Sequence, residues 1–233
     1  MKLLKRILIT LGLLIVLALI GGYFFLNHVK TVALPDYSKD VQIPGLTGEV
    51  TILRDSFAIP HIYAENEADL YRAVGFTMAQ DRLWQMDLLR RVTQGRLSEI
   101  MGKDQLNTDL LMRALRIQEK SKKVLAQSSP EIVAALEAFS AGVNFYMEKY
   151  PLPPEYRILN YKPEPWQPVH SINLIGYMSW DLTSGWGIEI FLHQLAKEVS
   201  SEHIIHLIPD SETHSTPVFS NEVPVFIPDE IIL

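Results

Sequence analysis

The chain has 233 residues, of which 48% are hydrophobic and 21% are charged, with a formal net charge of −6 at pH 7. This length allows one domain with a substantial core, or a modest domain plus a membrane segment. The acidic balance gives no general attraction to nucleic acid, because phosphate binders normally present a basic face. The chain has no cysteine, which excludes disulfides, cysteine metal ligands and cysteine nucleophiles.

The N-terminus predicts a membrane segment. Residues 1–6 form a basic end, and residues 7–26 carry no charged side chain. An apolar helix of this length spans about 30 Å, the thickness of a bilayer core, and the basic flank predicts that the remainder is exported. The run is long for a cleaved signal peptide and lacks a small-x-small site after it. We therefore expect an uncleaved signal anchor, with a cleaved signal as the alternative, and a stalk over residues 27–44, which include Pro35.

Two short extended segments are expected next. Residues 45–54 alternate partly between apolar and polar side chains, which predicts a strand. Asp55 and Ser56 form a turn, and residues 58–64 read as a second strand. Pro60 predicts that this second strand lies at a sheet edge or begins there.

A long helical region follows. Asn66 can cap its N-terminus, and apolar residues then recur at spacings of three and four up to Val92, with a bend or interruption expected around Gly75 and Asp81. The charged residues among the later positions are expected on a solvated face. They are Arg90, Arg91, Arg96 and Glu99.

The remainder is also mainly helical. Ser129, Pro130 and Glu131 give an N-cap, a first-turn proline and a first-turn acid, and the helix that they open should end near Tyr150. The proline-rich and aromatic stretch 151–168 is expected to be an ordered crossing loop. Further helices are expected over 104–118, 170–182 and 189–200.

Catalytic motifs are scarce. The chain has no Gly-x-Ser-x-Gly elbow, no glycine-rich phosphate loop and no His-Glu-x-x-His motif. His203 and His206 could form a metal pair, or they are two interfacial or surface histidines, since no third ligand cluster lies near them in sequence. Composition and periodicity alone therefore indicate an anchored, mainly helical extracytoplasmic domain.

Three collinear blocks nevertheless resemble the penicillin acylase family. They are residues 54–64 (RDSFAIPHIYA), residues 75–86 with Gly75-Phe76 and AQDRLWQM, and residues 90–99 (RRVTQGRLSE). The resemblance runs from about Gly45 to Glu189 and beyond. It implies that this mainly α chain with a few β-strands, preceded by one transmembrane helix, forms part of an αββα N-terminal-nucleophile hydrolase sandwich.

The resemblance also implies how the chemistry is divided. In this family a precursor is cut into an α chain, a spacer and a β chain whose first residue is the nucleophile. The terminal amine, with a pKa of about 7.7–8.0, can then serve as the base. Residues 45–208 resemble the α chain, and residues 209–233 are a tail or the start of the spacer. We therefore expect a truncated or split precursor, inactive without a β chain, that would act on N-acyl amides such as β-lactams or acyl-homoserine lactones.

The family's pattern can be carried to four positions. Met178 falls on the methionine of the acyl pocket, and Asp181 and Leu182 fall where penicillin G acylases have Arg-Phe. An acid cannot replace arginine beside a substrate carboxylate, which puts activity on penicillin itself in doubt, and core packing is an equal alternative for Met178 and Leu182. With one inserted residue, Glu189 falls on a glutamate that helps to bind calcium, whose other ligands would come from the β chain.

Two other functions compete with an acylase part. The chain could be a non-catalytic membrane-anchored remnant or binding domain, or a generic helical sensor domain behind an anchor. If the chain normally wraps a β chain, it should expose apolar surface when alone. We expect Trp84, Met86 and Trp166 to belong to that surface, and the isolated exported part to aggregate or to be protease-sensitive.

Overall fold

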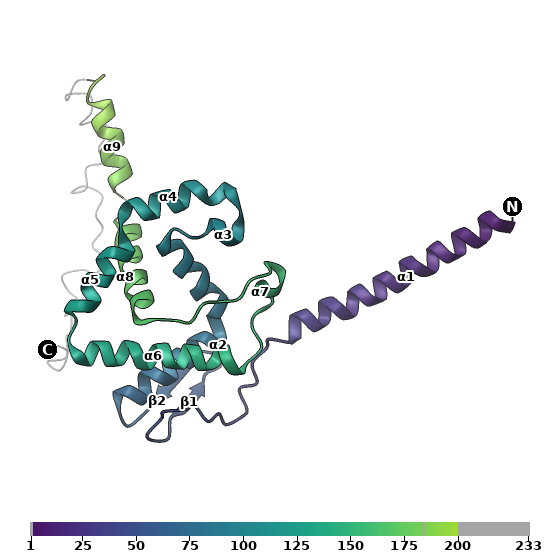
Figure 1. Ribbon diagram of the computed structural model, residues 1–233, viewed down its shortest axis with the longest axis horizontal. Coiled ribbons are helices and arrows are strands. Elements are labelled where there is room, and N and C mark those ends of the chain that lie inside the picture. Colours follow the sequence, from purple (N-terminus) through teal and green to yellow (C-terminus); the bar gives the residue numbers. More distant parts are fainter. Residues whose placement is uncertain (1, 184, 200–233) are drawn as a thin grey trace, which may run out of the picture. The chain divides into compact units, whose positions relative to one another are not determined.

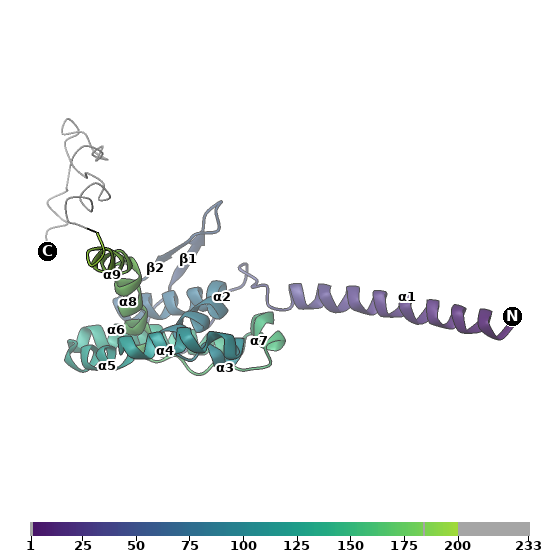
Figure 2. The same cartoon turned by 90° about the horizontal axis from the view of Figure 1, so that it is seen from above.

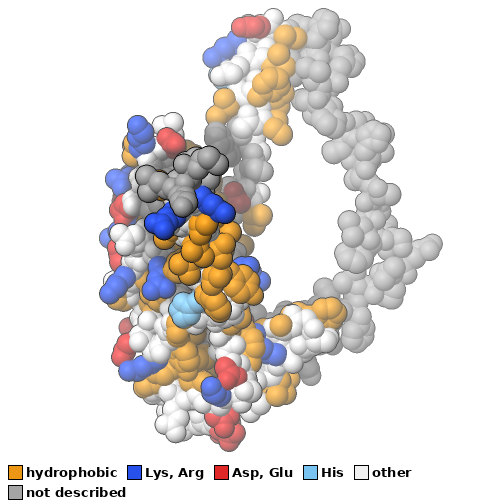
Figure 3. Space-filling view, turned by 90° about the vertical axis from the view of Figure 1, so that its right-hand side faces the viewer, with side chains coloured by type: hydrophobic (Ala, Val, Ile, Leu, Met, Phe, Trp, Pro, Cys, Tyr) orange, Lys and Arg blue, Asp and Glu red, His pale blue; other side chains and the backbone are white. Residues whose placement is uncertain are grey.

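The computed structural model describes residues 2–183 and 185–199. The first helix, α1, covers Lys2–Thr31 and so extends past the charge-free run. Within it, residues 5–31 are long and apolar enough to cross a membrane, with an 18-residue window of mean hydropathy 2.6, a test that a signal sequence also passes. Figure 3 faces the N-terminal end of this helix and shows apolar side chains gathered on it.

The rest of the described chain is mostly helical with few strands, as the sequence predicts (Figure 1). The strands are β1 (Thr51–Arg54) and β2 (Pro60–Tyr63), and the helices are α2 (Glu67–Gln94), α3 (Ser98–Met101), the 3₁₀ turn η1 (Lys103–Gln105), α4 (Leu106–Leu115), α5 (Ile117–Gln127), α6 (Pro130–Lys149), α7 (Pro154–Ile158), α8 (Pro168–Leu182) and α9 (Trp186–Leu195).

The two strands form an antiparallel hairpin in which Arg54 pairs with Pro60. Pro60 is the first residue of its strand, which confirms the expectation that a strand begins there. Figure 2 shows the hairpin on one side of α2 and α6 on the other. The hairpin turns Leu53 and Tyr63 outward, with 55% and 59% of their surface exposed.

Helix α2 begins as expected, with the Asn66 side chain accepting a hydrogen bond from the Asp69 amide. Its backbone leaves helical geometry at Arg82, where φ is −140° and ψ is 18°, which confirms the interruption expected near Asp81. The helix ends at Gly95, whose left-handed φ of 63° is available to glycine without steric penalty.

The core of the domain lies where α2 crosses α6. At Gly75 an added Cβ would lie 2.1 Å from the Phe139 carbonyl oxygen, and at Gly142 it would lie 2.0 Å from the Arg72 carbonyl oxygen. Two glycines facing opposite backbones therefore let the helices touch directly. Around this contact, Phe76, Leu83, Met86, Val143, Tyr146, Tyr156 and Trp166 form one buried cluster.

This burial corrects the expected apolar surface. Met86 and Trp166 are 6% and 3% exposed, so they belong to the chain's own core rather than to a surface that waits for a partner, and Trp84 packs against the same cluster while partly buried. The apolar surface that the chain does expose lies elsewhere. Its members include Phe57, Ile59, Leu110, Ile132, Ile175 and Met178.

The single helix expected over 104–118 is wrong. Arg116 adopts a left-handed conformation with φ of 56°, and this residue separates α4 from α5. By contrast, the helix opened by Pro130 runs to Lys149, as the sequence predicts, and the crossing loop after it contains the short helix α7.

The solvated face expected for the late charges of α2 is also wrong for its first two members. Arg90 and Arg91 are only 1% and 5% exposed. Arg90 forms an ion pair with Asp87, and its guanidinium donates to the Glu164 carbonyl oxygen at 2.7 Å. The Tyr161 hydroxyl donates to the same aspartate at 3.0 Å. The buried charges thus tie the crossing loop to α2.

The chain divides into two compact units, residues 1–181 and residues 182–233. Helix α9 belongs to the second unit. Its side chains Ile188, Ile190 and Phe191 are between 50% and 64% exposed.

Candidate functional site

Helix α8 carries three of the four predicted site residues, and its start is fixed by local hydrogen bonds. Pro168 occupies the first turn, and the Nδ1 atom of His170 accepts a hydrogen bond from the Gln167 amide at 3.0 Å. This side chain therefore satisfies a backbone donor that the helix itself cannot pair. Burial lowers the pKa of His170 to about 4, so the ring is neutral at pH 7 and can act as this acceptor.

Trp166, which lies just before α8, is held from two sides. Asn144 of α6 accepts from the Trp166 amide at 2.7 Å and donates to the Trp166 carbonyl oxygen at 3.0 Å. The Trp166 indole N–H donates to the Ser171 hydroxyl at 3.1 Å, and the Arg90 guanidinium lies 5.7 Å from the indole ring centre. The first turn of α8 is thus locked to both core helices.

The middle of α8 packs closely on α5. An added Cβ at Gly176 would lie 3.1 Å from the Cγ2 atom of Ile117, so only a very small residue fits without movement of this neighbour. Asn173 is fully buried, and its side-chain nitrogen and oxygen have no hydrogen-bond partner in the described part of the chain. Val169, His170, Ile172 and Asn173 are buried, so the first half of α8 packs into the interior of the fold.

The last turns of α8 differ sharply from its start. Ile175, Met178 and Leu182 are 64%, 57% and 78% exposed, and their spacing of three and four places them along one stripe of the helix. We call these three residues the α8 stripe. Asp181 is also exposed and lies on the same helix. The structure thus brings Met178, Asp181 and Leu182 to one exposed helix end.

Within the described residues, Met178 and Leu182 lie outside the buried core of this chain. Their assignment to an acyl pocket stays a prediction. Ile175 was missed by the sequence interpretation. The apolar spacing 175, 178, 182 is the signal that could have identified it.

An apolar groove lies beside the stripe. It has a volume of about 420 Å³ and lies between α5, α6 and α8. Ile117, Val124, Ile132, Leu136, Ile175 and Trp180 contribute to its lining. Lys120 also lines it, so the groove is mainly aliphatic with one cationic side chain.

Glu189, the predicted calcium ligand, lies on α9 in the second unit and is exposed. In residues 2–183 and 185–199 no three His, Asp or Glu side chains gather to hold a metal ion. Since calcium takes six to eight oxygen ligands, the described residues do not make a calcium site by themselves. His203 and His206 lie outside the described residues.

Comparisons with known proteins identify the family. The model of the penicillin amidase family matches residues 49–225. The chain is 42% identical over 155 residues to the penicillin acylase 2 proenzyme of Pseudomonas sp. strain SE83, covering 66% of this chain and 20% of that protein. It is 30% identical over 187 residues to the acyl-homoserine lactone acylase QuiP of Pseudomonas fluorescens Pf0-1, covering 79% of this chain and 23% of that protein.

A solved structure has a similar fold. The structure matches the thermostable penicillin G acylase from Alcaligenes faecalis with a TM-score of 0.57 and 24% identity, covering 77% of this chain and 97% of the matched chain. The chain spans about a fifth to a quarter of the length of the curated relatives, at 20% and 23%. The resemblance found in the sequence motifs is confirmed: the chain belongs to the penicillin amidase family.

Proposed function

We propose that this chain provides the helical, α-chain part of an acylase that hydrolyses the amide bond of N-acyl compounds. A second, β-type chain segment would supply the N-terminal nucleophile, its amine and the groups that stabilise the oxyanion. Together the two parts would build the αββα sandwich. The reaction class is hydrolysis of carbon–nitrogen bonds other than peptide bonds.

One observation carries the proposal. The matched region is only 20% of a proenzyme, yet it covers 97% of one chain of a solved penicillin G acylase. This supports the view that the region corresponds to a separate chain of an assembled enzyme. A second chain could also cover exposed apolar side chains such as Phe57 of the hairpin turn, which is 83% exposed, and Leu182, which is 78% exposed.

The α8 stripe is the proposed contribution of this chain to the acyl pocket. Its aliphatic and thioether side chains suit an acyl chain, and Met178 lies at its centre. Asp181 replaces the arginine expected for penicillin G acylases, so the proposed substrates favour acyl-homoserine lactones over penicillin. An anionic side chain next to a substrate carboxylate is repulsive, whereas a lactone carries no such charge.

Two further parts of the proposal concern location and calcium. Helix α1 would act as a single-pass anchor with the main domain on the extracytoplasmic side, supported by its length, its hydropathy and the basic residues at its N-terminal end. Glu189 would supply one oxygen ligand of a structural calcium ion in the assembled enzyme. The second chain would have to supply the others.

The test is co-expression of the chain with a candidate β segment, followed by an assay of the purified complex. Release of free amine would be measured for penicillin G and for acyl-homoserine lactones of several chain lengths. We expect hydrolysis of at least one acyl amide. A processed, stable complex that cleaves none of them would favour the alternative, a non-catalytic membrane-anchored remnant or binding domain.

A matched variant sharpens the assay. Asp181→Arg restores a cation where relatives that cleave penicillin G carry one, and a charge-assisted hydrogen bond contributes roughly 1.5–3 kcal/mol. The ratio of kcat/KM for penicillin G to that for an acyl-homoserine lactone should therefore rise about tenfold or more. Asp104→Arg, on the 3₁₀ turn η1, makes the same charge change away from α8 and should leave the ratio unchanged.

A further inference from the structure

The segment between α1 and the hairpin is held on the domain at three places. The first is Tyr37, whose hydroxyl donates to Asp81 Oδ1 at 3.0 Å. The guanidinium of Arg54 lies 3.9 Å from the centre of the Tyr37 ring and donates to both oxygens of Asp81 at 2.9 Å. Tyr37 is therefore clamped by one residue of β1 and one of α2.

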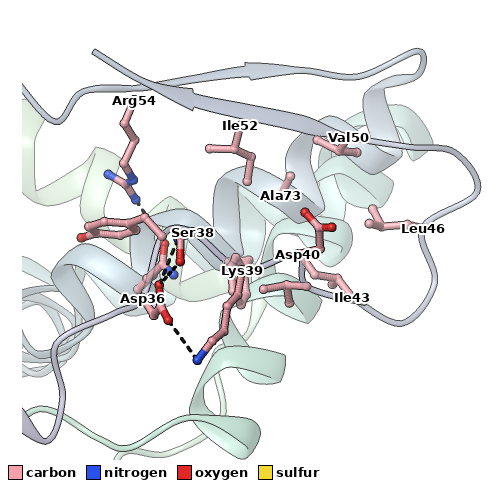
Figure 4. Close-up of a pocket in the computed structure, with 14 residues that line it drawn as sticks. Asp36, Ser38, Lys39, Asp40, Ile43, Leu46, Val50, Ile52, Arg54 and Ala73 are labelled. Atoms are coloured by element: carbon pink, nitrogen blue, oxygen red, sulfur yellow. Dashed lines mark hydrogen bonds and ion pairs between the residues drawn. The ribbon is translucent and has the colours of Figure 1, made fainter. Parts of the chain in front are cut away.

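The second place is apolar. Ile43 is 8% exposed and belongs to the core cluster, and Val41 and Leu46 pack against that cluster. The Arg72 side chain of α2 also donates to the Pro44 carbonyl oxygen at 3.1 Å. Figure 4 shows Ile52 pointing from the hairpin into a cavity of about 230 Å³, with Ile43 lining its opposite side.

The third place is Asp69. Its carboxylate accepts hydrogen bonds from the Thr47 amide at 3.0 Å, the Thr47 hydroxyl at 2.8 Å and the Gly48 amide at 2.9 Å. Hydrogen bonds from Asn66 and Thr47 lower the pKa of Asp69 to about 2. Asp69 itself is 1% exposed, so this end of the segment is tied to the N-terminus of α2.

We infer that residues 37–48 form a docked strap, and that the Tyr37 clamp holds the domain on a short tether to α1. The predicted stalk over 27–44 is correspondingly shorter, because α1 continues to Thr31 and the strap begins at Tyr37. Six peptide units, from Thr31 to Tyr37, reach at most about 20 Å. A chain free as far as Ile43 would reach roughly 40 Å, and one free as far as Thr47 roughly 55 Å.

The consequence rests on the proposed membrane role of α1. With the strap docked, the first docked residue of the domain stays within about 20 Å of the end of α1, and the domain is therefore held near the bilayer surface. With the strap released, the domain would range over a layer two to three times deeper. The Tyr37 clamp therefore limits the distance that the domain can move from the bilayer.

The test measures that distance in the full-length protein in lipid nanodiscs. The chain has no cysteine, so Lys30→Cys on α1 and Glu137→Cys on α6 give two clean positions for spin labels. Double electron–electron resonance of the otherwise native protein should give a narrow distance distribution, meaning one whose width stays within the roughly 20 Å reach of the tether between Thr31 and Tyr37. Tyr37→Ala should broaden it, and Tyr37→Ala with Ile43→Asp should broaden it further and extend it by 10 Å or more.

A control variant and a stability measurement accompany this test. Lys39→Ala removes a strap ion pair to Asp36 whose two side chains are 75% and 49% exposed, and this variant should keep the narrow distribution. Thermal unfolding of each variant separates release of the strap from loss of the fold. A broad native distribution, or one that Tyr37→Ala with Ile43→Asp leaves unchanged in a folded protein, would overturn the inference.

Flotation with lipid vesicles tests the anchor separately from the strap. If the protein does not float, the membrane part of the proposed function fails. The same resonance measurement in detergent still reports whether the strap is docked, because the two labels lie within the protein. Failure of the anchor and failure of the strap are therefore distinct results.

Discussion

The crossing of α2 and α6 and the last turns of α8 use apolar side chains in opposite ways. At the crossing, Val143 and Leu83 are 0% and 2% exposed, and glycines bring the two backbones into contact. At the end of α8, Met178 is 57% exposed, although the same helix is rigidly held at its start. The chain therefore completes its own core and still leaves apolar side chains exposed on a helix whose start is firmly held.

The largest expected effect comes from the buried charges that fasten the crossing loop to the core. Arg90→Ala removes the nearer ion-pair partner of Asp87, whose side chain is 2% exposed, and leaves it only Arg91 at 3.6 Å. Loss of one partner of a buried pair destabilises by about 3–5 kcal/mol. Chemical denaturation of the variant and the native protein measures this difference.

The matched control is Arg96→Ala. This side chain is 30% exposed and pairs with Glu99 and Glu164 near the surface, where an ion pair contributes about 1 kcal/mol or less. Equal losses for the two variants would show that burial of Arg90 does not govern its contribution.

The next largest effect concerns the helix crossing. Gly142→Ala places a methyl group 2.0 Å from the Arg72 carbonyl oxygen, so α2 and α6 must move apart. Such overpacking destabilises by about 1–3 kcal/mol, occasionally more, which the midpoint of thermal unfolding should register. Glu137→Ala on the exposed side of α6 should change it by little, and a neutral Gly142→Ala would contradict the close contact.

The free energy of unfolding should decrease at low pH because of His170. Its pKa is about 4 in the folded chain and about 6.5 in an unfolded one, so the unfolded state binds the proton first as the pH falls. The stabilising contribution of neutral His170 is fully present above about pH 6.5. As the pH falls towards 4, the free energy of unfolding decreases by up to about 3 kcal/mol. The stabilising contribution of Asp69, whose pKa is about 2, is retained across that window and is lost only as the pH falls from about 4 towards 2.

His170→Asn removes the titrating ring and keeps an acceptor for the Gln167 amide. The free energy of unfolding of this variant should fall less steeply between pH 6.5 and pH 4 than that of the native protein. His193→Gln, on the exposed side of α9, should retain the native slope. If His170→Asn also retains it, another group is responsible for the pH dependence.

The smallest effect on stability should come from the α8 stripe. Ile175→Ser with Met178→Gln removes exposed apolar surface and should change the free energy of unfolding by about 0.5 kcal/mol or less. Light scattering should show less aggregation of the isolated chain, because the surface that associates is reduced. A large loss of stability would mean that the stripe packs within the chain after all.

The sequence predicted those parts of the fold that depend on local signals. The cap at Asn66, the strand start at Pro60 and the helix opened by Pro130 are each determined by one residue's backbone preference or side-chain acceptor. The break at Arg116 was missed, because arginine has no intrinsic preference for a left-handed backbone. The burial of Arg90 was missed as well, because its partners Glu164 and Pro165 lie on a loop that only the tertiary fold brings close.

The positions of the candidate site residues on α8 could be predicted from the sequence, but their exposure could not. The motif resemblance placed Met178, Asp181 and Leu182 on one helix, and the structure has them there. The stripe could have been predicted from its spacing, but its exposure depends on how α5 and α6 pack against α8, which only the tertiary fold determines. The role of Glu189 could not be predicted further, because several ligands of a calcium ion must come from residues far apart in sequence.

The contact of Gly75 with Phe139 and of Gly142 with Arg72 also has a consequence for the order of folding. These pairs join α2 to α6 across all of α3, α4 and α5, so the loop that closes on forming them is long and entropically costly. During synthesis from the N-terminus, α2 is complete well before its main partner exists. The apolar face of α2 must therefore remain uncovered until α6 has emerged, and that interval is when the nascent chain most needs protection from aggregation.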